Sequence, residues 1–163
     1  MLDVKGLNKS FGGVAAISDV NIAFPTGSLT AIIGPNGAGK STFFNLISGG
    51  LQPDSGTVTF DGASLLGRSR AQIIDAGIGR AFQIARIFPT LTVEESLLGA
   101  VTAHRHRAQN VSRRFPLPEM RDRTFEVAEM LGLTEKLAVM SANLSHGDQK
   151  LLDIALALVL EPQ

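Results

Sequence analysis

One stretch constrains the fold of this chain more than any other: GPNGAGKST, which runs from Gly34 to Thr42. It satisfies the pattern G-x-x-x-x-G-K-[ST], in which a glycine-rich turn lets backbone N–H groups converge on phosphate oxygens. Such a loop follows a buried strand and opens a helix, whose N-terminus adds unpaired N–H groups and the positive end of its dipole. The pattern therefore predicts an α/β core that binds a nucleoside triphosphate.

The residues on either side of this loop fit that context. Residues 29–34 read LTAIIG, an aliphatic run typical of a strand that is buried on both faces. Residues 40–48 have the periodicity of a helix and are followed by two glycines, which predict its end. The face of this helix that we expect to be buried carries Phe43, Phe44 and Ile47.

Further elements can be predicted from periodicity. Alternation of apolar with small or polar residues over 20–24 and 57–60 indicates half-buried strands of an antiparallel sheet. GIGRAF, residues 77–82, predicts a further short strand. A helical block follows, with helices expected over residues 93–108, over 119–131 closed by Gly132, and from about Ser145 onward.

Each position of the loop is a candidate ligand contact, but two side chains have distinct roles. Lys40 can neutralise the β- and γ-phosphates, and the Ser41 hydroxyl can ligate Mg²⁺. The candidate ATP contacts of the loop are Gly34, Pro35, Asn36, Gly37, Ala38, Gly39, Lys40, Ser41 and Thr42.

A second candidate anion site begins the last predicted helix, in the sequence LSHGDQ at residues 144–149. Ser145 can cap this helix, and Asp148 three residues later completes an S-x-x-[DE] capping arrangement. The helix start would then present a hydroxyl group and the Gly147 amide to an anion. The alternative interpretation is an ordinary capped helix with no ligand.

Four stretches together, in this order, resemble the ATP-binding subunit of an ABC transporter: LNKSFGGVAAISDVNIAFPTGSLTAIIGPNGAGKST, SGTVTFDG, GIGRAFQ and LSHGDQ. The resemblance implies one nucleotide-binding domain over residues 1–163. Residues 1–83 would form a P-loop NTPase (RecA-like) core with an antiparallel β subdomain. Residues 84–155 would form an inserted helical subdomain with the signature motif.

The resemblance also implies roles for individual residues. Phe11 stands where the family stacks an aromatic ring, usually Tyr, on adenine; the alternative is that Phe11 only packs a hairpin. Gln83 matches the glutamine that reaches Mg²⁺ and the attacking water, and with Lys40 it is the expected catalytic residue. The signature residues, expected to contact the γ-phosphate held by a second subunit, are Ser145, His146, Gly147 and Asp148.

Within this family, LSHGDQ and FQIARIFPTLTVEESL resemble the importers of branched-chain amino acids. That resemblance implies ATP hydrolysis at a head-to-tail dimer interface, which drives transport. The implied partners are a second ATP-binding subunit, transmembrane permease subunits and, indirectly, an extracytoplasmic binding protein. The protein would lie at the cytoplasmic face of the inner membrane, held there by the permease.

Three other functions stay open at this point. One is an ABC ATPase that serves another substrate, such as urea or a lipid. Another is a soluble ABC protein that acts in DNA repair or on the ribosome, although such proteins usually carry long coiled-coil inserts or tandem domains. The third is an ATP-binding fragment without hydrolysis, because the family's Walker B strand, catalytic Glu and switch His would follow Gln163. We therefore expect the N-terminal part of a longer ATPase, with little hydrolysis by residues 1–163 alone.

Composition excludes several other classes. Lys plus Arg and Asp plus Glu number 15 each, so no net charge favours binding to nucleic acid. There is no Cys, which excludes disulfides and thiolate metal sites. The longest uncharged apolar run, residues 154–160, is far shorter than a membrane span of about 18 residues. Residues 104–123 carry six Arg and two His, either as a solvated segment or as a surface for a partner or lipid.

Overall fold

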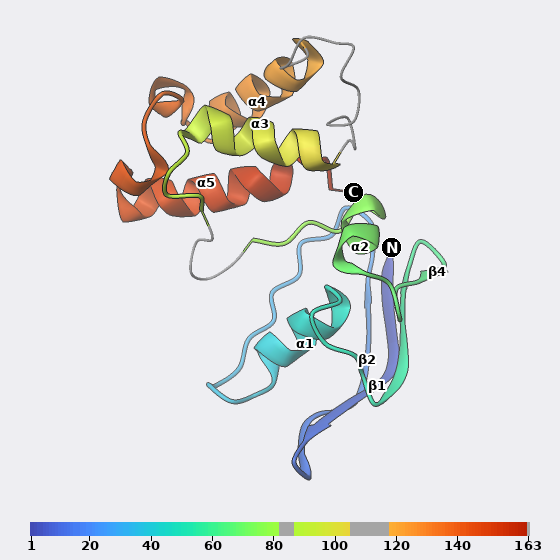
Figure 1. The fold of residues 1–163 in the computed structure, drawn as a ribbon. Helices are drawn as coiled ribbons and strands as arrows, with labels where there is room; N and C mark the ends of the chain where they lie inside the picture. Colours follow the sequence, from blue (N-terminus) through green and yellow to red (C-terminus); the bar gives the residue numbers. More distant parts are fainter. Residues whose placement is uncertain (82–86, 105–117, 163) are drawn as a thin grey trace. The chain divides into compact units, whose positions relative to one another are not determined.

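A computed structural model describes residues 1–81, 87–104 and 118–162 of the chain. The chain divides into two compact units, Met1–Ala76 and Gly77–Gln163. Figure 1 follows the first unit from blue to green and the second from green to red. The first holds a β-sheet with two short helices, and the second is helical.

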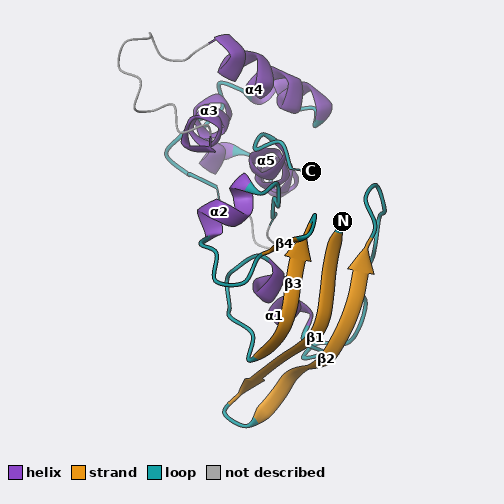
Figure 2. Ribbon diagram, turned by 90° about the vertical axis from the view of Figure 1, so that its right-hand side faces the viewer, coloured by secondary structure: helices purple, strands orange, loops and turns teal. Residues whose placement is uncertain are grey.

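The sheet of the first unit is antiparallel throughout and has the strand order β2-β1-β3-β4 (Figure 2). Its strands are β1 (Leu2–Phe11), β2 (Val14–Phe24), β3 (Ser55–Phe60) and β4 (Ala63–Ser64). Both strands predicted from alternation lie within it, as parts of β2 and β3. The predicted antiparallel sheet is therefore confirmed.

Strand β1, the central partner of both β2 and β3, was not predicted. Its fully buried side chains are Val4 and Leu7, three residues apart rather than two. The register of β1 shifts after Val4 against β2 and after Lys5 against β3. This irregularity interrupts the alternation of buried and exposed side chains by which the strand could have been predicted.

Helix α1 (Lys40–Ile47) forms as predicted, but its buried face differs from the expected one. Phe43 and Leu46 are buried, whereas the Phe44 side chain is 42% exposed. The expectation for Phe44 was wrong because successive residues point about 100° apart around a helix, and β2 covers the face of Phe43. The ring centroids of Phe43 and Phe24 lie 6.2 Å apart.

The two predicted strands at residues 29–34 and 77–82 are not strands in the described residues. Leu29 and Ile33 are 102% and 90% exposed. An aliphatic strand becomes buried on both faces only when parallel neighbours flank it and helices cover it. Within the described part of the chain, the sheet contains only β1 to β4, and none of these pairs with residues 29–34. Both predictions were therefore wrong for the described residues.

The second unit packs three helices around one apolar cluster: α3 (Val93–His104), α4 (Pro118–Met130) and α5 (His146–Leu158). Each was predicted, although residues 105–108 of the first prediction lie outside the described residues. The largest fully buried side chains of the helical cluster are Leu97, Met120, Leu133 and Leu152.

The first unit adds helix α2 (Arg70–Asp75), which has a capping box between Ser69 and Gln72 and was not predicted.

The segment before α5 is fixed to the start of α3. Two 3₁₀ helices, Thr134–Lys136 and Ser141–Asn143, shape this segment. The Val93 amide donates to the Val139 carbonyl at 3.1 Å, and the Ser141 amide donates to the Leu91 carbonyl at 2.9 Å. These bonds hold the chain in place just before the LSHGDQ stretch.

Within residues 1–81, 87–104 and 118–162, every helix is too short or too polar to cross a membrane. Most of the Arg-rich segment at residues 104–123, and Gln83, lie outside the described residues.

Candidate functional site

The phosphate loop, residues 34–42, turns into α1 through Gly39. Gly39 is the N-cap of α1 and has a left-handed backbone with φ 81° and ψ 1°. A Cβ atom added to Gly39 would overlap the carbonyl oxygen of Ala16. Both the backbone angle and the close approach therefore require glycine here.

The Ala16 carbonyl reaches the loop because of an irregularity in the β1–β2 ladder. Lys9 pairs with Ile17 while Ser10 pairs with Ala15, so Ala16 is the extra residue of a β-bulge. Bulges change the direction of backbone groups at functional sites. Here the bulge places the β1–β2 hairpin directly against the phosphate loop.

The start of α1 is open to an anion. Gly39 provides no side chain to cap the helix, and no side-chain hydrogen bond caps its N-terminus. The N–H groups of the first turn have no partner within the helix. By contrast, side chains of Ser69 and Ser145 cap α2 and α5. The α1 start is thus the better prepared of these helix starts to receive phosphate oxygens.

Lys40 adds a positive charge to the same place. Its ammonium group donates to the carbonyl oxygens of Gly34 and Pro35, at 2.6 Å each. Both acceptors are neutral, so these bonds hold the side chain over the loop without cancelling its charge. A phosphate arriving at the loop would meet the Lys40 ammonium and the amides of the α1 start together.

The donor set fits Mg²⁺ only when phosphate oxygens complete it. Ser41 lies exposed on the first turn of α1. Among the described residues, no group of three or more His, Cys, Asp or Glu side chains is arranged to hold a metal ion. Mg²⁺ commonly keeps waters and binds through few protein ligands plus substrate phosphates, which suits a single hydroxyl donor beside a triphosphate.

Phe11 is the last residue of β1. The residue is 47% exposed, which leaves room for a stacking partner. Gly12 and Gly13 follow with φ values of 54° and 84°, as tight hairpin turns with two left-handed residues require. Phe11 pairs with Val14, two residues along β2 from Ala16. Phe11 therefore lies on the same hairpin as the Ala16 carbonyl, which meets the phosphate loop at Gly39.

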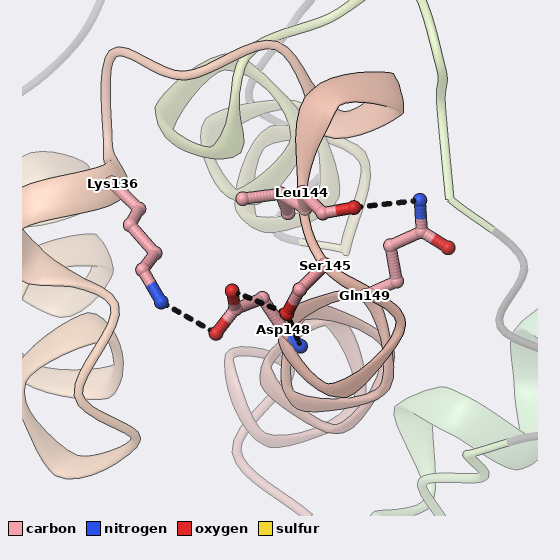
Figure 3. A network of polar contacts seen from close by, with 5 residues as sticks. All are labelled: Lys136, Leu144, Ser145, Asp148 and Gln149. Carbon is pink, nitrogen blue, oxygen red and sulfur yellow. Dashed lines mark hydrogen bonds and ion pairs between the residues drawn. The ribbon is translucent and has the colours of Figure 1, made fainter.

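The start of α5 forms a polar network of its own (Figure 3). The Asp148 amide donates to the Ser145 hydroxyl oxygen at 3.1 Å, which confirms the predicted cap. The Ser145 hydroxyl in turn donates to the Asp148 carboxylate at 2.7 Å. The other carboxylate oxygen accepts from the Lys136 ammonium group at 2.6 Å. The Gln149 amide group donates to the Leu144 carbonyl at 3.3 Å.

These bonds change the electrostatics of the α5 start. The Lys136 ammonium group and then the Ser145 hydroxyl hold the pKa of Asp148 below its usual value. Asp148 is therefore ionised at neutral pH, and Lys136 offsets its charge. Sequence reasoning missed Lys136 because nothing in the residue spacing indicates that a preceding 3₁₀ helix brings it to Asp148.

The predicted site residues thus fall into two groups. The first unit holds Phe11 at the end of the β1–β2 hairpin and residues 34–42 in the loop that meets this hairpin at Ala16. The second unit places residues 145–148 at the start of α5. Gln83, expected to act on Mg²⁺ and water, lies outside the described residues.

Comparison with known proteins decides between the possible families of phosphate-loop protein. A family model described as "ABC transporter" matches residues 17–163. The chain belongs to the ABC transporter family.

Two relatives show which ABC proteins are similar in sequence. The high-affinity branched-chain amino acid transport ATP-binding protein LivG of Escherichia coli (strain K12) is 36% identical over 171 residues, which take in 100% of this chain and 66% of LivG. A probable LivG of Archaeoglobus fulgidus is 37% identical over 162 residues, covering 98% of this chain and 63% of the relative. The chain therefore spans a little under two thirds of the length of these relatives.

Solved structures of ABC proteins share the fold. A nucleotide-free ATP-binding cassette from an ABC transporter matches with a TM-score of 0.82 and 32% identity, covering 99% of this chain and 66% of that one. The dimeric ABC transporter cassette MJ0796 matches with a TM-score of 0.82 and 28% identity, covering 99% of this chain and 71% of that one. These similarities confirm the predicted fold class, that of an ABC ATP-binding cassette.

Proposed function

We propose that this chain is the ATP-binding, energy-coupling part of an ABC importer for branched-chain amino acids. The open, glycine-capped start of α1 with Lys40 held above it carries the ATP-binding part of the proposal. The similarity to LivG proteins supports the substrate class. In the proposal, residues 34–42 bind the phosphates and Phe11 stacks on the base.

The second half of the proposed site would come from another subunit. The residues at the start of α5, Ser145 to Asp148, would face the γ-phosphate bound to the phosphate loop of a second ATP-binding subunit. The dimeric cassette among the similar structures supports this arrangement. Transmembrane permease subunits would hold the dimer at the cytoplasmic face of the membrane, and an extracytoplasmic binding protein would deliver the amino acid to them.

We propose that hydrolysis belongs to the full-length protein. Ser41 would bind Mg²⁺ together with phosphate oxygens, and Gln83 would orient the attacking water. When bound, Mg²⁺ offsets charge on the transferring phosphoryl group. Residues 1–163 alone are proposed to bind ATP but to hydrolyse it slowly, so a low hydrolysis rate beside intact ATP affinity would support this part of the proposal.

Lys40→Ala tests the ATP site. We expect the variant to lose detectable binding of ATP with Mg²⁺ in isothermal titration calorimetry, because the β- and γ-phosphates lose their only lysine contact in the loop. Lys5→Ala is the matched control, since Lys5 is an exposed lysine of β1 paired with Asp3 at 2.8 Å. Unchanged affinity in Lys40→Ala would refute the assignment of the phosphate loop.

The transport role needs a separate measurement. Affinity purification of the protein from its native cells is expected to recover transmembrane permease subunits whose transport substrate is a branched-chain amino acid. Recovery of permeases for another substrate would place the protein in a different branch of the ABC transporters. Recovery of ribosomal or DNA-repair proteins in their place would contradict the transport role itself.

A further inference from the structure

Lys9 and Asp54 form an ion pair beside the aromatic ring that ends β1. The Lys9 ammonium group donates to the Asp54 carboxylate at 2.7 Å. The other oxygen of Asp54 accepts from the backbone amide of Ser10, also at 2.7 Å. Asp54 therefore holds both the side chain of Lys9 and the backbone that leads to Phe11. Lys9 and then Ser10 hold the pKa of Asp54 below its usual value, as expected for a carboxylate that stays ionised in this pair.

The same ammonium group lies over the Phe11 ring. Its nitrogen is 5.6 Å from the ring centroid, within the range of about 6 Å in which a cation is attracted to the face of an aromatic ring. The Lys9 side chain is only 17% exposed, whereas Phe11 as a whole residue is 47% exposed. One side of the ring is thus occupied by a covered, pinned cation while much of the ring surface stays open.

The position of this ring relative to the phosphate loop is fixed through β2. Phe11 pairs with Val14, and the extra residue of the bulge, Ala16, lies two residues further along β2. At the rise of a strand this is a separation of about 7 Å. The Ala16 carbonyl is packed against Gly39. The backbone of Phe11 is therefore tied to the phosphate site through a short stretch of β2.

We propose that Lys9 is a positioning residue for the nucleotide base: pinned by Asp54, its ammonium group holds the Phe11 ring from one face so that the other face can receive a stacked base. The proposal rests on the proposed function, in which Phe11 stacks on the base of ATP. Lys9 acts through Phe11 and does not touch the nucleotide. Its contribution should therefore appear with ligands that have a base and be absent with ligands that consist of phosphates alone.

The test compares two ligands on residues 1–163: ATP and inorganic tripolyphosphate, each with Mg²⁺, by isothermal titration calorimetry. Lys9→Met keeps most of the aliphatic stem but removes the charge. We expect this variant to lower the affinity for ATP about two- to fivefold, which is the size of a cation–aromatic contact at a partly exposed site. The affinity for tripolyphosphate should stay unchanged. Lys9→Arg should restore ATP affinity, because a guanidinium can both pair with Asp54 and lie over the ring.

Two further variants separate the possible causes. Asp54→Asn removes the carboxylate that pairs with Lys9. It should lower the affinity for ATP and leave the affinity for tripolyphosphate unchanged, which keeps the test available even if Lys9→Met is too unstable to measure. Lys5→Met is the matched control, because Lys5 is an ion-paired lysine on the same strand that has 72% of its side chain exposed. Lys5→Met should change neither the affinity for ATP nor the affinity for tripolyphosphate.

Phe11→Ala makes failure of this proposal distinguishable from failure of the proposed function. Phe11→Ala could lower the affinity for ATP but not for tripolyphosphate while Lys9→Met and Asp54→Asn change neither affinity. In that case the positioning role of Lys9 is wrong and the stacking role of Phe11 stands. If Lys9→Met lowers the affinities for ATP and tripolyphosphate equally, Lys9 acts through its charge on the phosphates at long range, and the proposal is overturned. If Phe11→Ala changes neither ligand, the base does not stack on Phe11, and both ideas fail.

Discussion

Asp148 shows how one residue changes the character of a helix start. The amides of the first turn and the helix dipole both favour a negative charge at this end of α5, and Asp148 supplies one. Its amide donates to the Ser145 hydroxyl, so the chain satisfies part of this helix start by itself, and its carboxylate accepts from Lys136 and Ser145. At α1 the N-cap is Gly39, which has no side chain to cap the helix, and the first turn carries no acidic residue. The two predicted anion sites therefore differ in their local charge, although both begin a helix.

The lowered pKa of Asp148 predicts a specific dependence of stability on pH. A carboxyl group whose native pKa lies below the unfolded value of 3.8 adds stability that is complete above that value and is lost as pH falls through the native pKa. We expect the unfolding free energy of the wild type to fall more than that of Asp148→Asn between about pH 6 and about pH 3. Urea denaturation followed by circular dichroism at both pH values measures this difference.

Asp54 provides the control for this experiment, because its pKa is also lowered and it lies in the first unit. Asp148→Asn keeps the contribution of Asp54, so the variant should still lose some stability in acid. Identical acid sensitivity of the wild type and Asp148→Asn would show that the bonds of Asp148 contribute nothing to folding.

Among the elements, helix α5 combines a polar first turn with an apolar face that packs in the core. Its first turn presents the polar network, while Leu152 and Ala155 are fully buried in the cluster shared with α3 and α4. The apolar run at residues 154–160 overlaps this helix only in part. Burial follows the helical face rather than the run, since Ile154 within the run is 40% exposed and Leu152 before it is buried.

Leu152→Ala should therefore destabilise the helical unit more than Ile154→Ala on the same helix. Truncating a buried leucine removes apolar contacts and leaves a cavity, at a cost of about 2–5 kcal/mol. Ile154→Ala removes a partly exposed side chain and should cost well under about 2 kcal/mol. Chemical denaturation of the two variants tests this, and equal losses would contradict the burial pattern of α5.

At the scale of the whole molecule, the proposed ATP contacts are divided between two units. Phe11 and the phosphate loop lie in Met1–Ala76, and the LSHGDQ stretch lies in Gly77–Gln163. In the proposed dimer, the phosphate loop of the first unit holds its own nucleotide, and the start of α5 in the second unit contacts the nucleotide held by the partner subunit.

This division predicts how ATP should protect the backbone in hydrogen–deuterium exchange. In dilute samples where the protein is monomeric, ATP should slow amide exchange in residues 34–42 and leave residues 144–149 unchanged. At concentrations where two copies associate, or with a second ATP-binding subunit added, both segments should become protected. Protection of residues 144–149 in a monomer would contradict their proposed contact with the partner's nucleotide.

Local sequence signals were enough to predict the motifs and most of the helices. The phosphate loop has a fixed residue pattern because only certain backbone shapes bind phosphate, and α3, α4 and α5 follow from local periodicity and from start and stop residues. The Ser145 cap could be predicted for the same reason, since it joins residues only three apart. Local rules also predicted the strands that alternate regularly.

Only the tertiary structure decided the features that depend on distant residues. The burial of Phe43 rather than Phe44 depends on which face β2 covers. The bulge at Ala16, the pairing of Lys136 with Asp148 and the contact of Lys9 with Asp54 join residues that no local pattern connects. Residues 29–34 have the composition of a buried strand, but a strand also needs neighbours to pair with, and composition alone cannot provide them.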